Sequence, residues 1–172
     1  DFCLSRGLGD VYKRQKQYAE WIATEIGAEL KHISDVSVTD LARFERVIIG
    51  GYLHMGKIIG VKFLCDEWNV LQNKNVILFT VSGAGPGPAE EKFYTDNVPA
   101  HIREKIAHFG LLGRAMDLDL KDRLLVAVPQ SMLYLKYLFN RTPENKAAYE
   151  GFKPFDGVKK ENLDPLLMHL HG

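Results

Sequence analysis

Two strand–loop segments, each an apolar run that ends at glycines, most constrain how this chain can fold. Val47–Ile49 is a β-branched run without polar alternation, as is typical of a strand covered by helices on both faces. Two glycines follow, and we expect them to release the backbone into an aromatic and apolar loop, Tyr52–Gly56. Val76–Val81 repeats the plan, with the glycine-rich loop Ser82–Pro88 behind it. This pattern predicts a parallel α/β sheet with ligand sites at the carboxyl ends of its strands.

Charge and cysteine content exclude several classes of protein. Lys and Arg total 22, as do Asp and Glu, so the formal net charge of the 172-residue chain is zero. A general nucleic-acid binder needs a basic surface, and we therefore expect no nucleic-acid partner. Cys3 and Cys65 are too few for a disulfide framework, which favours a reducing, cytoplasmic location. The length predicts one domain with a substantial core.

Helical periodicity supplies the elements between the strands. Tyr18, Ile22 and Ile26 recur at helical spacing and predict a helix that Gly27 ends. Including this one, we expect helices at about 16–26, 58–71, 98–109, 121–139 and 163–170, and further strands at 28–33 and near 111–112. The count fits a doubly wound sheet of five parallel strands, provided that residues 1–15 contribute the first strand.

Four segments, taken in order, resemble a known family. They are KQYAEWIATEIGAEL, RVIIGGYLHMGKI, NVILFTVSGAGP and LLGRAMDLDLKDRLL. Together they resemble the flavodoxin-domain family, and more narrowly its branch that includes menaquinone-dependent protoporphyrinogen oxidase. The resemblance extends from Lys16 to about Leu170. It implies one flavodoxin-like α/β domain of three layers, residues 1–172, with a doubly wound parallel sheet of strand order 2-1-3-4-5.

The resemblance also implies an FMN site formed by three loops. The second and third loops correspond to Gly51, Tyr52, Leu53, His54, Met55 and Gly56, and to Ser82, Gly83, Ala84 and Gly85. Tyr52 would stack on the flat isoalloxazine ring, or else pack on its own protein as a loop tyrosine. His54 would hydrogen-bond flavin or substrate, although a solvent-facing loop histidine is the commoner case. Backbone groups of Ser82, Gly83 and Ala84 would hydrogen-bond the polar edge of the flavin, which we favour over a turn without a ligand.

The first loop departs from the family pattern. Relatives place a Ser/Thr-Lys-x-Gly-Thr-Thr loop here to bind the FMN phosphate, whereas Asp10–Gln15 contains no Ser, Thr or Gly. Leu4–Gly9, with one Arg and two Gly, makes a poor central strand. The string SRGLGDVYKRQ resembles translated adapter sequence. We therefore expect residues 1–15 to be a non-native or disordered replacement of the first strand and phosphate loop, with weakened FMN binding.

Three functions fit these observations. An FMN-dependent oxidoreductase resembling protoporphyrinogen oxidase would act on a small reduced substrate, with a quinone as possible electron acceptor. A flavodoxin-type carrier would instead dock on a redox partner protein, and a flavin-free α/β scaffold is the third alternative. We assign no catalytic residue. We predict no metal site, because His169 and His171 lack Cys or carboxylate partners at ligand spacing.

The apolar stretch Leu124–Phe139 has two interpretations. It is apolar on more than one face, although it contains Pro129 and Lys136. Either it is buried in the protein, or it makes peripheral contact with a membrane or partner.

Overall fold

Contacts divide the chain into two compact units. The computed structural model describes residues 1–5, 10–115, 131–143, 145 and 155–172. The first unit comprises Asp1–Gly113 with Gly157–Gly172, and the second is Arg114–Asp156. The expected single-domain organisation stays a prediction. In the described ranges, no helix is both long and apolar enough to span a membrane.

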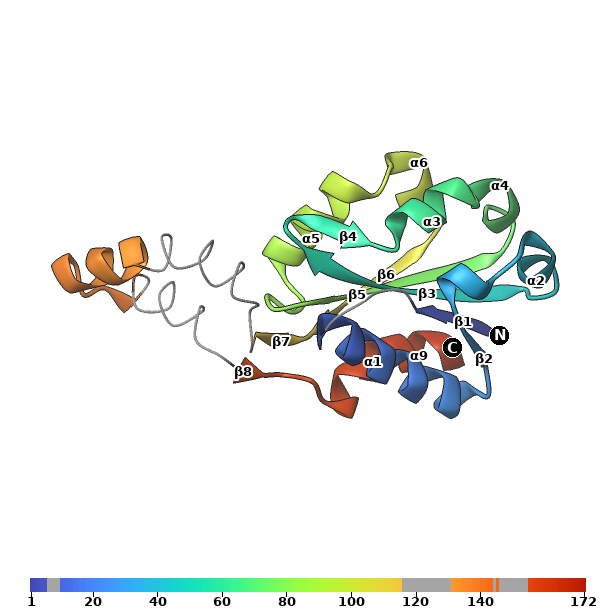
Figure 1. The fold of residues 1–172 in the computed structure, drawn as a ribbon, viewed down its shortest axis with the longest axis horizontal. Helices are drawn as coiled ribbons and strands as arrows, with labels where there is room; N and C mark the ends of the chain where they lie inside the picture. The colour runs from blue at the N-terminus through green and yellow to red at the C-terminus, as the bar shows by residue number, and fades with distance from the viewer. Residues whose placement is uncertain (6–9, 116–130, 144, 146–154) are drawn as a thin grey trace. The chain divides into compact units, whose positions relative to one another are not determined.

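The first unit is built on a parallel sheet with the expected order (Figure 1). Its five parallel strands run in the order β2-β1-β3-β5-β6, which is 2-1-3-4-5 when the short antiparallel β4 (Lys57–Ile59) is left out. The doubly wound fold is therefore confirmed. The bounds of the parallel strands are β1 (Phe2–Ser5), β2 (Glu29–His32), β3 (Arg46–His54), β5 (Asn75–Ser82) and β6 (Ala107–Leu112).

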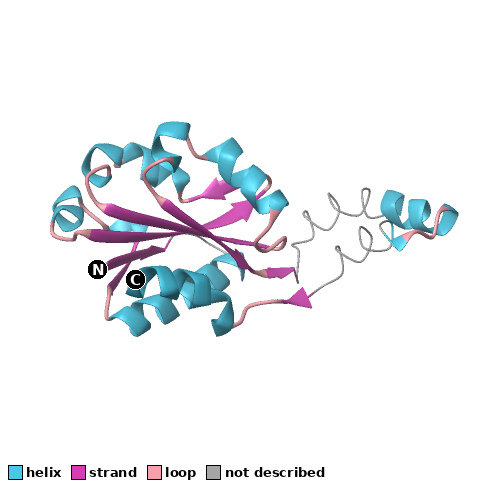
Figure 2. Cartoon of the chain, turned by 180° about the vertical axis from the view of Figure 1, so that it is seen from behind, coloured by secondary structure: helices cyan, strands magenta, loops and turns pink. Residues whose placement is uncertain are grey.

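Helices cover both faces of this sheet and complete three layers (Figures 1 and 2). On one face, α1 (Asp10–Ile26) and α9 (Asp164–His171) pack on the odd-numbered positions of β5. The opposite face packs on the even-numbered positions. Its helices are α2 (Val38–Ala42), α3 (Val61–Asp66), α4 (Trp68–Leu71), α5 (Pro88–Asn97) and α6 (Ala100–Arg103). The first unit also contains two short 3-10 helices, η1 (Ile33–Asp35) and η2 (Lys160–Leu163).

The first strand forms, but not where the sequence placed it. We expected Leu4–Gly9, whereas β1 is Phe2–Ser5 and pairs with β2 on one side and β3 on the other. Phe2, Cys3 and Leu4 are fully buried, so the strand has the apolar character that a central position requires. Asp10–Gln15 belongs to α1, and the expectation of disorder over residues 1–15 stays a prediction. The non-native origin of residues 1–15 stays a prediction.

The side chains of β1 anchor it to both layers. The Phe2 ring stacks on Phe44 with centroids 4.6 Å apart. On the opposite face, the Cys3 thiol lies 3.8 Å from the carbonyl oxygen of Ala19 in α1. Because alternate strand residues face opposite sides of a sheet, three residues suffice to contact both helical layers.

The segment after Val47–Ile49 is a β-hairpin, not a loop. β3 continues to His54, and β4 pairs back on it through Tyr52, Leu53 and His54. A Cβ added at Gly51 would lie 2.7 Å from the carbonyl oxygen of Ile59. Gly51 therefore allows a close approach of the protein's own backbone, and the expectation that the chain leaves the sheet at this glycine is wrong.

Two expected helices differ from those observed. The helix predicted at 58–71 starts only at Val61, after β4, and is divided into α3 and α4 at Glu67. The helix predicted at 98–109 is wrong in its second half, because Ala107–Leu112 is the edge strand β6. The sequence analysis missed α5, whose first turn carries Pro88. Proline suits that position because the first N–H groups of a helix have no partner within it.

The second unit contains two short strands and a helix. β7 (Arg114–Ala115) and β8 (Phe155–Asp156) pair antiparallel. A helix over residues 131–139 supports the last part of the helix predicted at 121–139; residues 116–130 lie outside the described part of the chain. The side chains of Met132, Tyr134, Leu135, Leu138 and Phe139 are exposed.

The close approach at Gly51 yields a stability prediction. Gly51→Ala should lower the free energy of unfolding by about 1–3 kcal/mol, because the methyl group must push β4 away from β3. Lys57→Ala, an exposed change on β4, should alter it by less than about 0.5 kcal/mol. Urea denaturation of both variants measures the difference. Equal stabilities would show that the hairpin does not hold Gly51 tightly.

Candidate functional site

The two predicted site segments meet at the carboxyl edge of the sheet. Tyr52 of β3 is paired with Val81 of β5, and Val81 in turn with Leu111 of β6. Ser82 is the next residue of β5 and its last. Parallel strands end at the same edge, which is where open α/β sheets bind ligands. The structure thus brings Tyr52 and Ser82 onto neighbouring strands, as predicted.

A tight turn follows β5. The carbonyl oxygen of Ser82 accepts hydrogen bonds from the backbone N–H of Gly85 at 3.4 Å and of Gly113 at 2.7 Å. Gly85 has a φ of +65°, where a side chain would be strained, and a Cβ there would lie 2.9 Å from Leu112 Cδ1. Gly83 and Ala84 are exposed at the tip of the turn. Their backbone groups are accessible to a ligand.

The predicted residues of the second loop are divided between the core and the surface. Tyr52 is half-buried and packs against the core cluster under α1 and α9, while Leu53 packs against the opposite cluster. The exposed His54, Met55 and Gly56 form the hairpin tip. The structure therefore places Gly51 and Tyr52 of this segment next to β5, whereas His54 and Met55 extend beyond the parallel strands.

The hairpin tip is held by the end of α5. Asn97 Nδ2 donates to the carbonyl oxygen of Gly56 at 2.9 Å, and the backbone N–H of Ile58 donates to Asn97 Oδ1 at 3.1 Å. A neutral amide that satisfies one acceptor and one donor fixes a turn without a charge. These contacts hold the tip beside the helix that follows the Ser82 turn.

Two buried polar side chains in the described chain have no hydrogen-bond partner near this edge. Ser82 Oγ is one, in a residue that is 4% exposed. The other is the amide of Gln15, which is fully buried over the sheet; a Cβ at Gly50 would lie 2.4 Å from its nitrogen. An unsatisfied buried polar atom is costly, and a functional role is one accepted reason for keeping it. Sequence reasoning missed Gln15, because a lone Gln carries no motif.

The positions expected to hold the phosphate are helical. Asp10–Gln15 forms the start of α1, so it is not the loop to which the family pattern was aligned. The connection between β1 and α1 is residues 6–9, which lie outside the described part of the chain. The comparison of Asp10–Gln15 with a phosphate-binding loop is therefore wrong in register.

Comparisons with known proteins agree with this architecture. The family model described as flavodoxin domain matches residues 14–135, more than half of the chain. The chain belongs to the flavodoxin-domain family. Membership of this family points to flavin binding, and Ser82, whose buried hydroxyl lacks a partner, fits such a ligand. None of the curated proteins compared matches the chain.

Three solved structures resemble this flavodoxin-domain chain, all at low identity. Two-electron reduced Megasphaera elsdenii flavodoxin is 20% identical, with a TM-score of 0.43, and covers 64% of this chain and 83% of its own. A flavodoxin from the domain Archaea is 14% identical (TM-score 0.44; 67% and 85% covered). The Trp repressor binding protein from Bacillus subtilis is also 14% identical (TM-score 0.44; 90% and 98% covered).

The unsatisfied hydroxyl of Ser82 yields a second stability prediction. Ser82→Ala should leave the free energy of unfolding unchanged or raise it by up to about 1 kcal/mol, because no hydrogen bond is lost. Thr80→Ala is the matched control on the same strand. Its hydroxyl donates to Glu90 Oε1 at 2.5 Å, so its loss should cost about 1–3 kcal/mol. Chemical denaturation of both variants tests the contrast, and a destabilised Ser82→Ala protein would mean that Ser82 has a partner.

Proposed function

We propose that this protein is an FMN-dependent redox protein whose flavin binds at the carboxyl edge of the sheet, between Tyr52 and the Ser82–Gly85 turn. The observation that carries the proposal is the buried, unpartnered hydroxyl of Ser82 at the end of β5 in a flavodoxin-domain chain. FMN supplies electron transfer when bound, while the protein binds and orients it.

The side chains divide this task by chemistry. Ser82 Oγ would donate a hydrogen bond to the polar edge of the flavin or accept one from it, and would thereby gain the partner that it lacks. Backbone groups of Gly83 and Ala84 are exposed for the same purpose. Tyr52 would offer its aromatic ring to the flat isoalloxazine. His54 and Met55, exposed at the hairpin tip, would contact the flavin rim or the substrate.

Between the two redox roles, the charges around the turn favour the oxidoreductase. A carrier that docks on basic partners needs an acidic face. Glu90, however, is buried, and Asp96 pairs with Lys92 at 2.6 Å, so Glu91 is the one acidic side chain of α5 that is exposed without a lysine partner. We therefore propose an oxidoreductase of the protoporphyrinogen oxidase type acting on a small reduced substrate, with the electron carrier as the alternative.

Flavin binding can be tested by titrating FMN with the full chain and following the quenching of its fluorescence. Tyr52→Ala should weaken binding by about 1–3 kcal/mol, on the scale measured for aromatic–base stacking. Tyr52→Phe should bind like the parent chain, because the ring is kept, and Ser82→Ala should bind more weakly. Met168→Ala, at an exposed site on α9, is the control for unspecific effects.

The same titration separates the proposal from its alternatives. A folded chain that quenches no FMN fluorescence would support the flavin-free scaffold. Binding that is equally tight in the Tyr52→Ala and Ser82→Ala variants would remove both residues from the site.

We also propose that the helix over residues 131–139 touches a membrane surface, where a quinone acceptor would be available. Its sequence, SMLYLKYLF, combines exposed apolar side chains with two Tyr and one Lys. Tyr and Lys are suited to the boundary between headgroups and acyl chains, because each pairs an apolar body with a polar end.

Liposome sedimentation tests this contact. The parent chain should pellet with vesicles, and the double variant Leu135→Lys/Phe139→Lys should pellet at least several-fold less. Met168→Lys, which also charges an exposed apolar site, should behave like the parent. If all three pellet equally, the helix has no role in membrane contact.

A further inference from the structure

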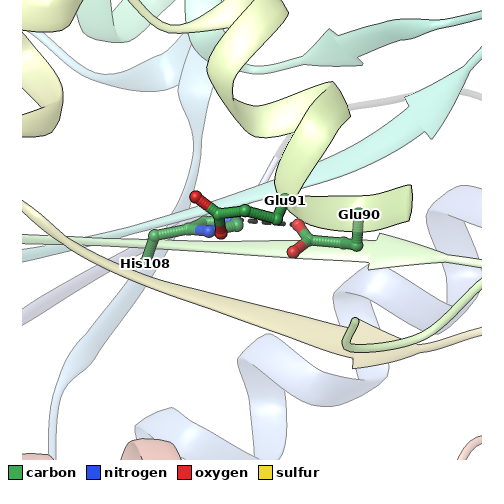
Figure 3. Close-up of side chains that lie close together, drawn as sticks. All are labelled: Glu90, Glu91 and His108. Carbon is green, nitrogen blue, oxygen red and sulfur yellow. Dashed lines mark ion pairs between the residues drawn. The ribbon is translucent and has the colours of Figure 1, made fainter. Parts of the chain in front are cut away.

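A cluster of polar side chains lies between α5 and the edge strand β6 (Figure 3). Glu90 and Glu91 come from the first turn of α5, and His108 from β6. His108 Nε2 lies 3.0 Å from Glu90 Oε1. One potential ligand atom from each of the three residues lies within 4.8 Å of the others. We propose that this cluster binds a divalent transition-metal cation of the zinc class.

The geometry of the buried pair suits a metal. Zinc binds imidazole nitrogen and carboxylate oxygen at about 2.0–2.2 Å, which sets neighbouring ligands roughly 3.3–3.5 Å apart in a tetrahedron. The 3.0 Å separation between His108 Nε2 and Glu90 Oε1 is close to this spacing. Glu91 is exposed and therefore free to rotate its carboxylate toward the pair. Three protein ligands leave the fourth position to water.

Charge and burial both suit a cation at this cluster, where Glu90 is otherwise paired with His108 and Thr80. The side chains of His108 and Glu90 are only 8% and 7% exposed. A buried carboxylate is costly unless it is paired or coordinates a metal. With a neutral imidazole, the two carboxylates balance the charge of a divalent ion. Because one ligand is nitrogen, the set suits zinc, cobalt or nickel better than magnesium or calcium, which prefer oxygen ligands.

Neighbouring residues hold the ligands in place. Thr80 Oγ1 donates to Glu90 Oε1 at 2.5 Å and lies 2.9 Å from His108 Nε2. The ring of Tyr94 stacks flat on His108, with centroids 3.8 Å apart and planes 4° from parallel. Stacking fixes the orientation of the imidazole ring, and a cation at Nε2 would replace the contacts that this nitrogen makes with Glu90 Oε1 and Thr80 Oγ1.

Gly110 provides the space for the Glu90 carboxylate. It is paired with Thr80 across β5 and β6, and a Cβ at this position would lie 2.7 Å from Glu90 Cδ. Any other residue here would push the carboxylate away from His108. The first turn of α5 and strand β6 thus supply the side chains of the cluster, and the absence of a side chain at Gly110 leaves room for the Glu90 carboxylate.

Isothermal titration of the chelator-stripped full chain with Zn²⁺ tests the proposal. We expect one Zn²⁺ per chain, and no comparable binding of Mg²⁺. Glu91→Gln, which changes an exposed side chain, should weaken Zn²⁺ binding at least tenfold while the protein stays folded, and so should Glu90→Gln and His108→Gln. Thr80→Val should weaken it about 10–100-fold, because an orienting partner of a ligand is lost.

Matched controls identify the ligands. Glu104→Gln and His171→Gln, both exposed and outside the cluster, should bind Zn²⁺ like the parent chain. Bound Co²⁺ should give visible ligand-field bands without the thiolate charge-transfer band that either cysteine would produce. The proposal is overturned if the parent chain binds no Zn²⁺, if Glu91→Gln binds it normally, if His171→Gln abolishes binding, or if Co²⁺ shows thiolate ligation.

Discussion

Parallel pairing of β1 on both of its edges is the constraint on which the rest of the first unit depends. Phe2–Ser5 supplies only four residues, yet it connects β2 to β3 and so to the rest of the sheet. All three described apolar side chains of β1 are fully buried, divided between the two helical layers. A short strand can hold a central place only if every residue serves both pairing and packing. The pairing of β1 with β3 and of β3 with β5 sets the relative positions of the strand ends at the carboxyl edge of the sheet.

Tyr18 connects α1 to the edge strand β6. Its buried hydroxyl donates to the carbonyl oxygen of Leu112 at 2.7 Å, at the end of β6, and accepts from Asn162 Nδ2 at 2.6 Å. One phenol thus joins the first helix, the edge strand and the segment that leads into α9. Buried networks of this kind rigidify a fold when every member is satisfied. The end of β6 is fixed beside the Ser82 turn partly for this reason.

The sequence predicts those features of the structure that arise from residues close together in the chain, and misses those that arise from contacts between separate elements. The apolar runs of β3 and β5 gave the parallel sheet, and family resemblance gave its strand order. Gly51 shows the limit: a glycine signals close approach, but not whether a ligand or the protein's own β4 approaches. The first strand was misplaced because Phe2–Leu4 is too short for periodicity to stand out. The Glu90 and His108 cluster was missed because its members come from separate elements, and only the fold brings them together.

Because Cys3 is buried in the central strand β1, its thiol should react with labelling reagents much more slowly than an exposed thiol. Burial raises the pKa of the Cys3 thiol to about 12, whereas Cys65 is exposed on α3. The thiolate is the nucleophile that electrophiles attack, so a maleimide or iodoacetamide reaches Cys65 in the native protein and Cys3 only when β1 opens. The rate of labelling at Cys3 therefore reports how often β1 separates from its neighbouring strands. Cys65, meanwhile, offers a single exposed position for a fluorophore on α3.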